Sequence, residues 1–293
     1  MVESQCSTLP FFGIIRVSGD DRAAFLHNQL SNDVNHLPIG SACLATYNSP
    51  KGRVLANVLV LNRGHDILLV TAADLCDALL KRLRLFVLRS QVVLEKMPDW
   101  AVAGCCSVDE TDPQIPGQAQ HVLATEQQQD VWCITLPNGN IMMLGNTASL
   151  PAYTEKNALM WYCHQIQNGQ PWINAASSET CVAQMLNQHL LGAIHFKKGC
   201  YPGQEIIARA QYRGQVKRGL VLVDAAGILQ DGEAIFNDQQ EEVGIIINQA
   251  PQANGSLGLA VMKYGAIGLP LHTASHVLLS CKFFFFNQPE GAA

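Results

Sequence analysis

Residues 40–97 combine strand and helix patterns in an order that restricts the fold of this chain more than any other feature. Two apolar runs flank a short segment whose Pro50 and Gly52 favour a hairpin turn. Apolar residues at helical spacing follow further along, at Leu75, Leu79, Leu83 and Phe86. The expected elements are strands at 42–47, 53–61 and 66–71, a helix at 73–88 and a strand at 91–96. This β-β-β-α-β succession predicts a compact α+β unit.

The pattern changes on both sides of this unit. Before it, a strand is expected at 11–17 and a helix starts near Ser18, where capping oxygens and early acids gather. After it, strands at 131–136 and 140–145 precede a helix at 155–168. From about residue 219, short strands alternate with Gly, Asn and Pro turns, at 219–223, 243–248, 257–262 and 276–286. This last region predicts a small all-β barrel or sandwich.

The composition is that of a folded protein with a large core. The chain has 293 residues, of which 48% are hydrophobic and 15% charged, so two or three domains are expected. No apolar stretch is long enough to predict a membrane span. The first residues lack the basic start and long apolar run of a secretory signal, which favours a cytoplasmic location.

Charge and cysteine usage exclude some functions. A net charge of −5 argues against a general nucleic-acid binder. Residues 195–219 nevertheless hold six basic side chains against one acid, which predicts local attraction for anions. The ten cysteines show no C-x-x-C motif and no zinc-site spacing, so no metal site is expected. In a reducing compartment most of them should be buried thiols.

The helix at 155–168 carries a Trp in an unusual place. Its apolar stripe is formed by Leu159, Cys163 and Ile166. At about 100° per residue, Trp161 falls on the opposite face. Such a ring covers either a second domain or a planar ligand, and the sequence leaves both interpretations open.

The segment from His195 to Glu205 is the richest in chemistry. It reads HFKKGCYPGQE, and its glycines and proline predict a tight, irregular turn. Two lysines precede Cys200, and nearby ammonium groups lower a thiol pKa. The alternative is a purely structural turn. A Cys/His hydrolase is not favoured, because His189 and His195 have no third orienting group in the sequence.

This segment closely resembles the signature of the YgfZ family, bacterial folate-binding proteins linked to tRNA modification and iron–sulfur enzymes. The family is related to the T-protein, the aminomethyltransferase of the glycine cleavage system. The signature K-G-C-Y-x-G-Q-E is matched at each fixed position, by Lys198, Gly199, Cys200, Tyr201, Gly203, Gln204 and Glu205, and Arg209 continues the match. Further similar stretches lie at 28–34, 51–53 and 168–171.

The resemblance implies an α+β fold of three domains around a central opening. The first domain would be discontinuous, formed by residues 1–38 and 100–205. The second, at 39–99, would be ferredoxin-like, and the third, at 206–293, would be the C-terminal β-barrel.

The resemblance also implies two aromatic contacts to a folate, either tetrahydrofolate or a derivative. One is Trp161, eight residues before the Gly of the Gly169-Gln170-Pro171 turn. The other is Phe12, where relatives have Trp; Phe keeps a flat face but lacks the indole N–H. Cys200 would be the reactive group, facing the same cavity.

The leading hypothesis is therefore a folate-binding accessory protein that supports iron–sulfur enzymes, such as radical-SAM tRNA methylthiotransferases, and thereby tRNA thiolation or methylthiolation. Stable direct tRNA binding and membrane association are not expected. One alternative is a folate-dependent one-carbon transferase or demethylase, although the stretch 52–57 lacks the carboxylate that the T-proteins place there. Another is a non-catalytic scaffold whose Cys200 loop docks a partner.

Overall fold

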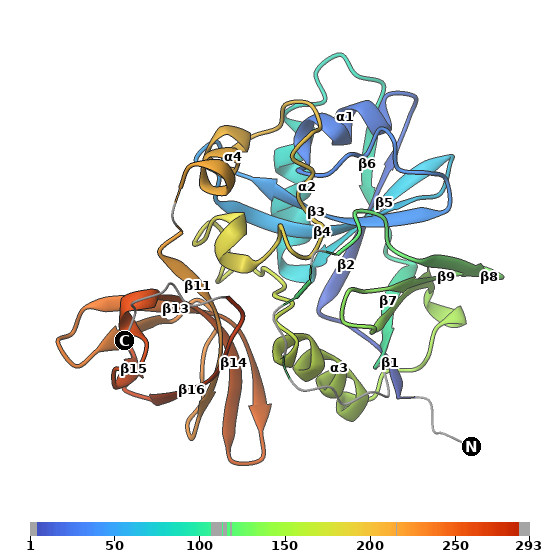
Figure 1. Ribbon diagram of the computed structural model, residues 1–293. Helices are drawn as coiled ribbons and strands as arrows, with labels where there is room; N and C mark the ends of the chain where they lie inside the picture. Colours follow the sequence, from blue (N-terminus) through green and yellow to red (C-terminus); the bar gives the residue numbers. More distant parts are fainter. Residues whose placement is uncertain (1–4, 107–112, 114–115, 118, 215, 287–293) are drawn as a thin grey trace.

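The computed structural model describes residues 5–106, 113, 116–117, 119–214 and 216–286. Two five-stranded sheets and a closed six-stranded barrel make up the molecule (Figure 1). The two sheets occupy the upper and right parts of the view, and the barrel lies at the lower left. The predicted mixture of α and β structure with a C-terminal barrel is confirmed.

The sheet predicted for residues 40–97 has the strand order β3-β4-β5-β2-β6. The expected hairpin is present, because β3 and β4 pair antiparallel around the turn at 49–53. The bounds are β3 Ser41–Asn48, β4 Val54–Asn62, β5 Asp66–Ala72 and β6 Val93–Lys96, with the 3-10 turn η1 Ala73–Leu75 leading into α2 Cys76–Arg84. The predicted helix at 73–88 therefore ends four residues early, and Leu88 adopts a positive φ of 44°.

The strand β2, Phe12–Ser18, lies inside this sheet, between β5 and β6. The helix α1, Arg22–Gln29, follows it directly. The predicted division between residues 1–38 and 39–99 is therefore wrong for β2, which hydrogen-bonds to the second segment. An apolar strand pattern does not reveal which strands it pairs with, and so the sequence could not place β2.

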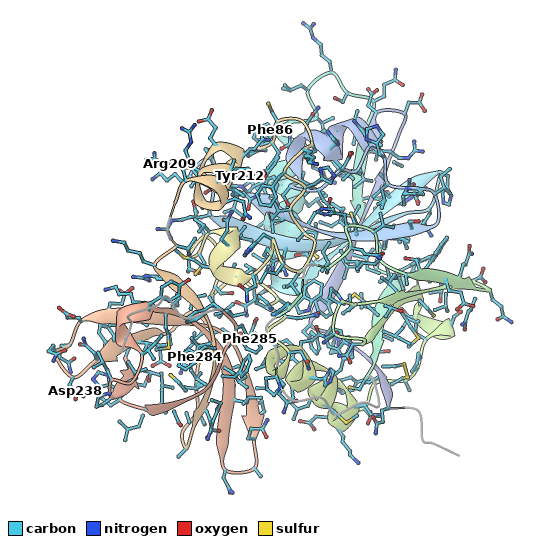
Figure 2. All side chains as sticks on the ribbon, in the orientation of Figure 1. Phe86, Arg209, Tyr212, Asp238, Phe284 and Phe285 are labelled. Carbon is cyan, nitrogen blue, oxygen red and sulfur yellow. A yellow bond between two sulfur atoms is a disulfide. The ribbon has the colours of Figure 1, made fainter. Side chains whose placement is uncertain are left out.

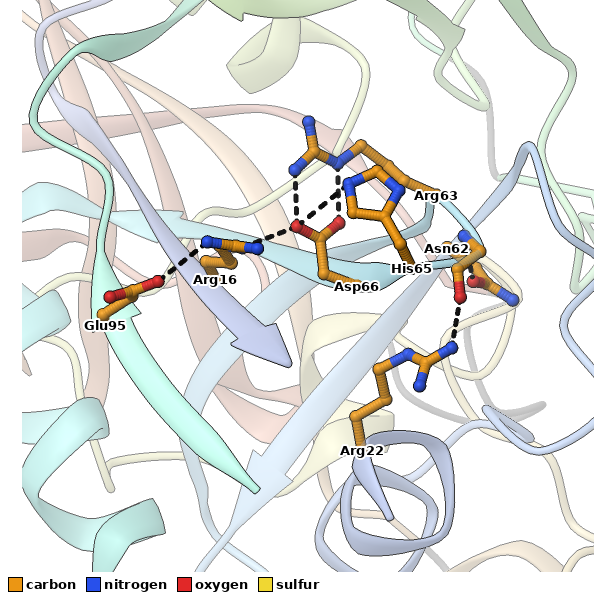
Figure 3. Close-up of polar contacts among 8 residues, drawn as sticks. Arg16, Arg22, Asn62, Arg63, His65, Asp66 and Glu95 are labelled. Carbon is orange, nitrogen blue, oxygen red and sulfur yellow. Dashed lines mark hydrogen bonds and ion pairs between the residues drawn. The ribbon is translucent and has the colours of Figure 1, made fainter. Parts of the chain in front are cut away.

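A buried carboxylate ties three strands of this sheet together. Asp66 at the start of β5 accepts hydrogen bonds from Arg63 and from Arg16 on β2, at 2.6–2.7 Å (Figure 3). Arg16 also pairs with Glu95 on β6 at 3.0 Å. Burial opposes ionisation of Asp66, but the hydrogen bonds from the two arginines outweigh it and lower its pKa. The cluster is structural, because it fixes the register of β2 against its neighbours.

The other sheet has the order β1-β7-β10-β9-β8. The bounds are β1 Cys6–Thr8, β7 Trp100–Cys105, β8 Thr125–Gln128, β9 Val131–Thr135 and β10 Ile141–Asn146, followed by η2 Thr147–Ser149 and α3 Glu155–Gln167. Cys6 and Cys105 are register partners on β1 and β7 and form a disulfide. The expectation of free thiols is therefore wrong for these two residues.

The C-terminal strands form a closed barrel and not a sandwich, the two alternatives that the sequence left open. It closes in the order β11-β14-β13-β12-β15-β16. The bounds are β11 Arg218–Ala225, β12 Ala234–Asn237, β13 Glu242–Gln252, β14 Gly255–Lys263, β15 Leu271–Thr273 and β16 Leu278–Phe284, preceded by η3 Ala183–Leu186 and α4 Gln204–Tyr212 and interrupted by η4 Tyr264–Ala266. The barrel strands thus begin at Arg218 rather than at 206, since α4 lies outside them.

The barrel and the sheets share core residues. Phe285, labelled in Figure 2, is fully buried and packs so closely on Gly169 that a Cβ there would lie 2.7 Å from its ring. The helix α3 contacts β1 and β7 on one side and β13 and β14 on the other. In the described part of the chain, no helix is both long enough and apolar enough to cross a membrane.

Candidate functional site

A cavity of about 350 Å³ lies where the β2–β5 sheet, α3 and the barrel meet. Small-molecule sites have volumes of roughly 300–1,000 Å³, so the cavity fits one flat ligand of modest size. Its walls combine four aromatic rings with carboxylate and amide groups. The lining residues are Phe11, Phe12, Ala72, Ala73, Asp74, Tyr162, Trp172, Asn174, Asp231 and Gln249.

The aromatic wall is built from contacting rings. Phe12 meets Trp172 edge to face, with ring centroids 4.7 Å apart. Phe11 lies 5.1 Å from both Phe12 and Tyr162. These separations are typical of favourable aromatic pairs, so the wall is held in place before any ligand binds. Phe12, predicted from sequence, is thus part of the cavity wall.

The backbone around Trp172 is clamped by two buried asparagines. Asn57 on β4 donates to Pro171 O and accepts from Ile173 N, both at 2.8 Å. Asn248 on β13 accepts from Trp172 N at 2.9 Å and donates to its carbonyl oxygen at 2.7 Å. One asparagine belongs to a sheet and the other to the barrel, so the clamp fixes the ring at their junction.

Asp231 supplies the strongest polar feature of the cavity. Its Oδ2 accepts a hydrogen bond from the amide of Asn174. Its Oδ1 is buried, and among the described residues no donor reaches it at full hydrogen-bond geometry, the backbone of Gln249 being the nearest contributor. Burial raises the pKa of Asp231 to about 6, although hydrogen bonding to the Asn174 side chain and to the backbone of Gln249 opposes the rise. At neutral pH the group is mostly ionised and offers a ligand one buried, unused acceptor.

Asp74 is a second acid at the cavity, and its carboxylate accepts from Ala175 N at 3.0 Å. Sequence reasoning sought a carboxylate only at 52–57 and missed both Asp74 and Asp231. Neither has a recognisable motif. Their common position depends on the approach of the barrel to the sheet, which no local pattern reveals.

Trp161 does not line this cavity, and the prediction of a ligand-facing indole is wrong. The side chain is 0% exposed. It packs on β7, where a Cβ on Gly104 would lie 2.6 Å from the indole ring. Trp161 contacts Phe12 edge to face at 5.7 Å and so supports the wall from behind. The helix α3 is covered on both sides, so the face opposite its apolar stripe is also buried, and the adjacent Tyr162 reaches the cavity.

The predicted cysteine loop is anchored by two of its own side chains. Lys198 is 8% exposed and donates to the carbonyl oxygens of His27 and Leu30 at the end of α1, the latter at 2.7 Å. Its ammonium also lies 5.0 Å from the ring centre of Tyr201. Burial lowers the pKa of Lys198 to about 8, while the negative charge of Asp33 opposes the shift. Lys198 thus acts as a buried cap for α1.

Gly203 allows the loop to dock on the β3–β4 turn. It has a φ of +79° and stands at the start of α4. A Cβ there would lie 2.6 Å from Ser49 O and 2.7 Å from Gly52 Cα. Only glycine meets both requirements without strain.

The remaining motif residues reach solvent. Gly199, Cys200, Glu205 and Arg209 are exposed, and Gln204 is half-buried. Among the free cysteines that the structure describes, Cys200 alone is exposed. Arg209 and Tyr212 lie on α4, away from the barrel (Figure 2). The described residues contain no metal-binding cluster of His, Cys, Asp or Glu side chains.

The loop and the cavity segment contact different parts of the β3–β4 hairpin. The loop contacts Gly52, just before the strand, whereas Asn57 holds the cavity segment. Five residues of strand span about 17 Å. Cys200 is not among the residues that line the cavity, so the expectation that it shares one cavity with the folate-contacting aromatics is wrong. No lining residue of the cavity is basic, so the stretch 195–219 does not form its rim.

The fold is that of the aminomethyltransferase T proteins. The glycine cleavage system aminomethyltransferase T from Bartonella henselae superposes with a TM-score of 0.66 and 12% identity, covering 97% of this chain and 86% of that one. No family model matches the chain.

Curated relatives of this chain carry the name tRNA-modifying protein YgfZ, and two of them illustrate the similarity. The protein from Yersinia enterocolitica is 27% identical over 251 residues, covering 81% of this chain and 75% of its own. The protein from Photorhabdus laumondii is 28% identical over 234 residues, covering 73% of this chain and 71% of its own. The resemblance to the YgfZ family predicted from the sequence is confirmed.

Proposed function

We propose that this chain binds a reduced folate in the aromatic cavity and serves tRNA modification. The pterin ring of a folate is flat and carries an N–H and an amino group side by side. A buried carboxylate is the natural acceptor for such a donor pair. The buried carboxylate of Asp231, whose Oδ1 lacks a full hydrogen bond and which borders a wall of four aromatic rings, is the observation that carries the proposal.

Tetrahydrofolate binding tests the pocket directly. Titration calorimetry on Asp231→Asn should show affinity reduced roughly 10- to 100-fold, since a charge-assisted hydrogen bond contributes about 1.5–3 kcal/mol. Phe12→Leu should also weaken binding, because it removes one ring of the wall.

Asp224→Asn is the matched control, since Asp224 is another barrel acid but pairs with Lys282 away from the cavity. Equal affinity of Asp231→Asn and Asp224→Asn for tetrahydrofolate would refute the proposal that folate binds in this cavity.

The role in tRNA modification is proposed to act through Cys200. The names of the relatives and the exposed thiol support it. Because Cys200 does not line the cavity, folate bound there would not touch the thiol. Iron–sulfur enzymes, such as those that methylthiolate tRNA, are the proposed partners at this loop. If Cys200→Ala restores tRNA thiomodification fully in a deletion strain, the thiol has no such role.

A one-carbon transferase or demethylase remains the second candidate. The carboxylates of Asp74 and Asp231 favour it, because they border the cavity and supply the acidic groups that the stretch 52–57 lacks. Its signature is turnover: methylene- or methyl-folate consumed in excess of protein. Consumption limited to one equivalent would exclude it.

A further inference from the structure

The turn that joins α2 to β6, residues 85–92, exposes large apolar side chains. Leu85, Phe86 and Leu88 are 67%, 47% and 87% exposed, although the sequence placed Phe86 in the apolar stripe of a helix. Leu83 and Val87 pack on the core instead. The turn projects at the top of the molecule, away from the barrel (Figure 1). Single exposed apolar residues are normal, but three within four positions indicate a surface that another body covers.

Hydrogen bonds hold this turn in place. Ser90 N donates to Val87 O at 2.7 Å, and Gln91 N donates to the Asp21 carboxylate at 2.7 Å. Leu88 adopts a left-handed φ of 44°, which is rare for a bulky residue. Packing of the Leu88 side chain does not explain this backbone, because that side chain is largely exposed. Strained backbone of this kind concentrates where a protein binds or recognises something.

The apolar side chains of the turn lie within a positively charged segment. Residues 78–94 contain no acid and four basic residues, all of them exposed: Lys81, Arg82, Arg84 and Arg89. Within the described part of the chain, none of the four forms an ion pair. The acid on α2, Asp77, pairs with Lys96, and the acid on β6, Glu95, pairs with Arg16. The four positive charges are therefore free to meet an anionic partner.

We propose that the α2–β6 turn docks on an anionic lipid surface. Leu85, Phe86 and Leu88 enter the interfacial layer, and the basic side chains contact the headgroups. Buried apolar area and attraction to anionic lipids add together in such binding, and this turn supplies both. A second copy of the chain would bring two sets of cations together, which opposes self-association through this surface. The inference goes beyond the proposed function and reverses the expectation that the chain does not associate with membranes.

Flotation of the full chain with lipid vesicles tests the proposal. Vesicles of equal parts phosphatidylglycerol and phosphatidylcholine should bind the protein, and added salt should weaken the binding. The double variant Leu85→Ser, Leu88→Ser should lower the partition coefficient at least about tenfold, because two apolar side chains lose their favourable transfer from water. Arg89→Gln should lower it roughly fivefold, the equivalent of about 1 kcal/mol for one basic residue near an anionic surface.

Ile228→Ser is the matched control, because Ile228 is 77% exposed but lies between β11 and β12 of the barrel. It should bind vesicles as the wild type does. The replaced side chains are exposed, so all variants should keep the wild-type urea midpoint, and a loss of binding then does not reflect unfolding.

Three vesicle results would overturn the proposal: a wild type that does not bind anionic vesicles, equal binding to pure phosphatidylcholine, or unchanged binding of the double leucine variant. A wild-type dimer in sedimentation equilibrium that the double variant dissociates would assign the turn to a second copy and would also overturn it. Tetrahydrofolate is absent from these measurements, so failure of the proposed function is recognised separately.

Discussion

Replacement of Asp231 by Asn should stabilise the protein at neutral pH while it weakens the proposed site. Burial raises the pKa of Asp231 from 3.8 to about 6 in the fold. That difference corresponds to roughly 3 kcal/mol between the ionised and protonated forms. Because the residue is only partly enclosed, we expect Asp231→Asn to gain about 1–3 kcal/mol near pH 7.5. Asn174 can still donate to the new side-chain oxygen.

The sign of the pH dependence follows from the raised pKa. Between about pH 3.8 and 6 the folded state holds this proton more tightly than the unfolded state. Ionisation of Asp231 therefore lowers the free energy of unfolding progressively as the pH rises through this window. Above about pH 6 the full destabilisation is present. The advantage of Asp231→Asn should be largest near pH 7.5 and should vanish near pH 4.

Urea unfolding followed by Trp fluorescence measures both free energies of unfolding. Asp224→Asn serves as the control, since that acid is exposed on one side and pairs with Lys282. A destabilised Asp231→Asn protein at pH 7.5, or a difference that does not change with pH, would refute the reasoning. Such a result would mean that the carboxylate is satisfied in the free protein and is not held ready for a ligand.

Three further predictions concern the supports of the fold. Lys198→Met should lower the free energy of unfolding by about 1–3 kcal/mol, because two carbonyl oxygens at the end of α1 lose a charged donor. Lys197 is exposed, so Lys197→Met should change the free energy of unfolding little. Comparison of the urea unfolding midpoints of the two variants tests this prediction. Asp66→Asn should cost about 3–5 kcal/mol near pH 7. The pKa of Asp66 is lower in the folded state than in the unfolded state. Asp66 therefore stabilises the fold fully above its unfolded-state pKa, and this stabilisation is lost as the pH falls through its folded-state pKa. The melting temperatures of the wild type and the variant should converge in acid. Gly203→Ala should loosen the cysteine loop, because the new Cβ meets Ser49 O at 2.6 Å; faster trypsin cleavage between 197 and 213 is expected, and unchanged cleavage would contradict it.

The sequence allowed accurate prediction of local structure. The hairpin at 42–61, the strand of Phe12 and the helix of Trp161 depend on spacing and turn residues within a few positions. The strands β12 and β15 were missed, because runs of four and three residues are too short to show alternation. The resemblance to the YgfZ family was also readable, since its motif is contiguous.

The prediction of the site was less complete for a physical reason. Phe12 was placed at the cavity, but Trp161 was chosen over Tyr162 because a helix packed on two sides has no single buried stripe. The signature loop also proved to be partly structural. Lys198, Tyr201 and Gly203 hold it against α1 and the β3–β4 turn, and Cys200 is the group that remains exposed.

The amino-acid sequence by itself determined most of the longer elements, the barrel region and the family resemblance, because each depends on neighbouring residues. Only the tertiary structure decided that β2 lies between β5 and β6, that Asp231 meets the aromatic wall, and that Lys198 of the cysteine loop contacts the end of α1. Lys198 and His27 are 171 positions apart in the chain. Their contact arises from the packing of the loop on α1, which no local pattern of residues encodes.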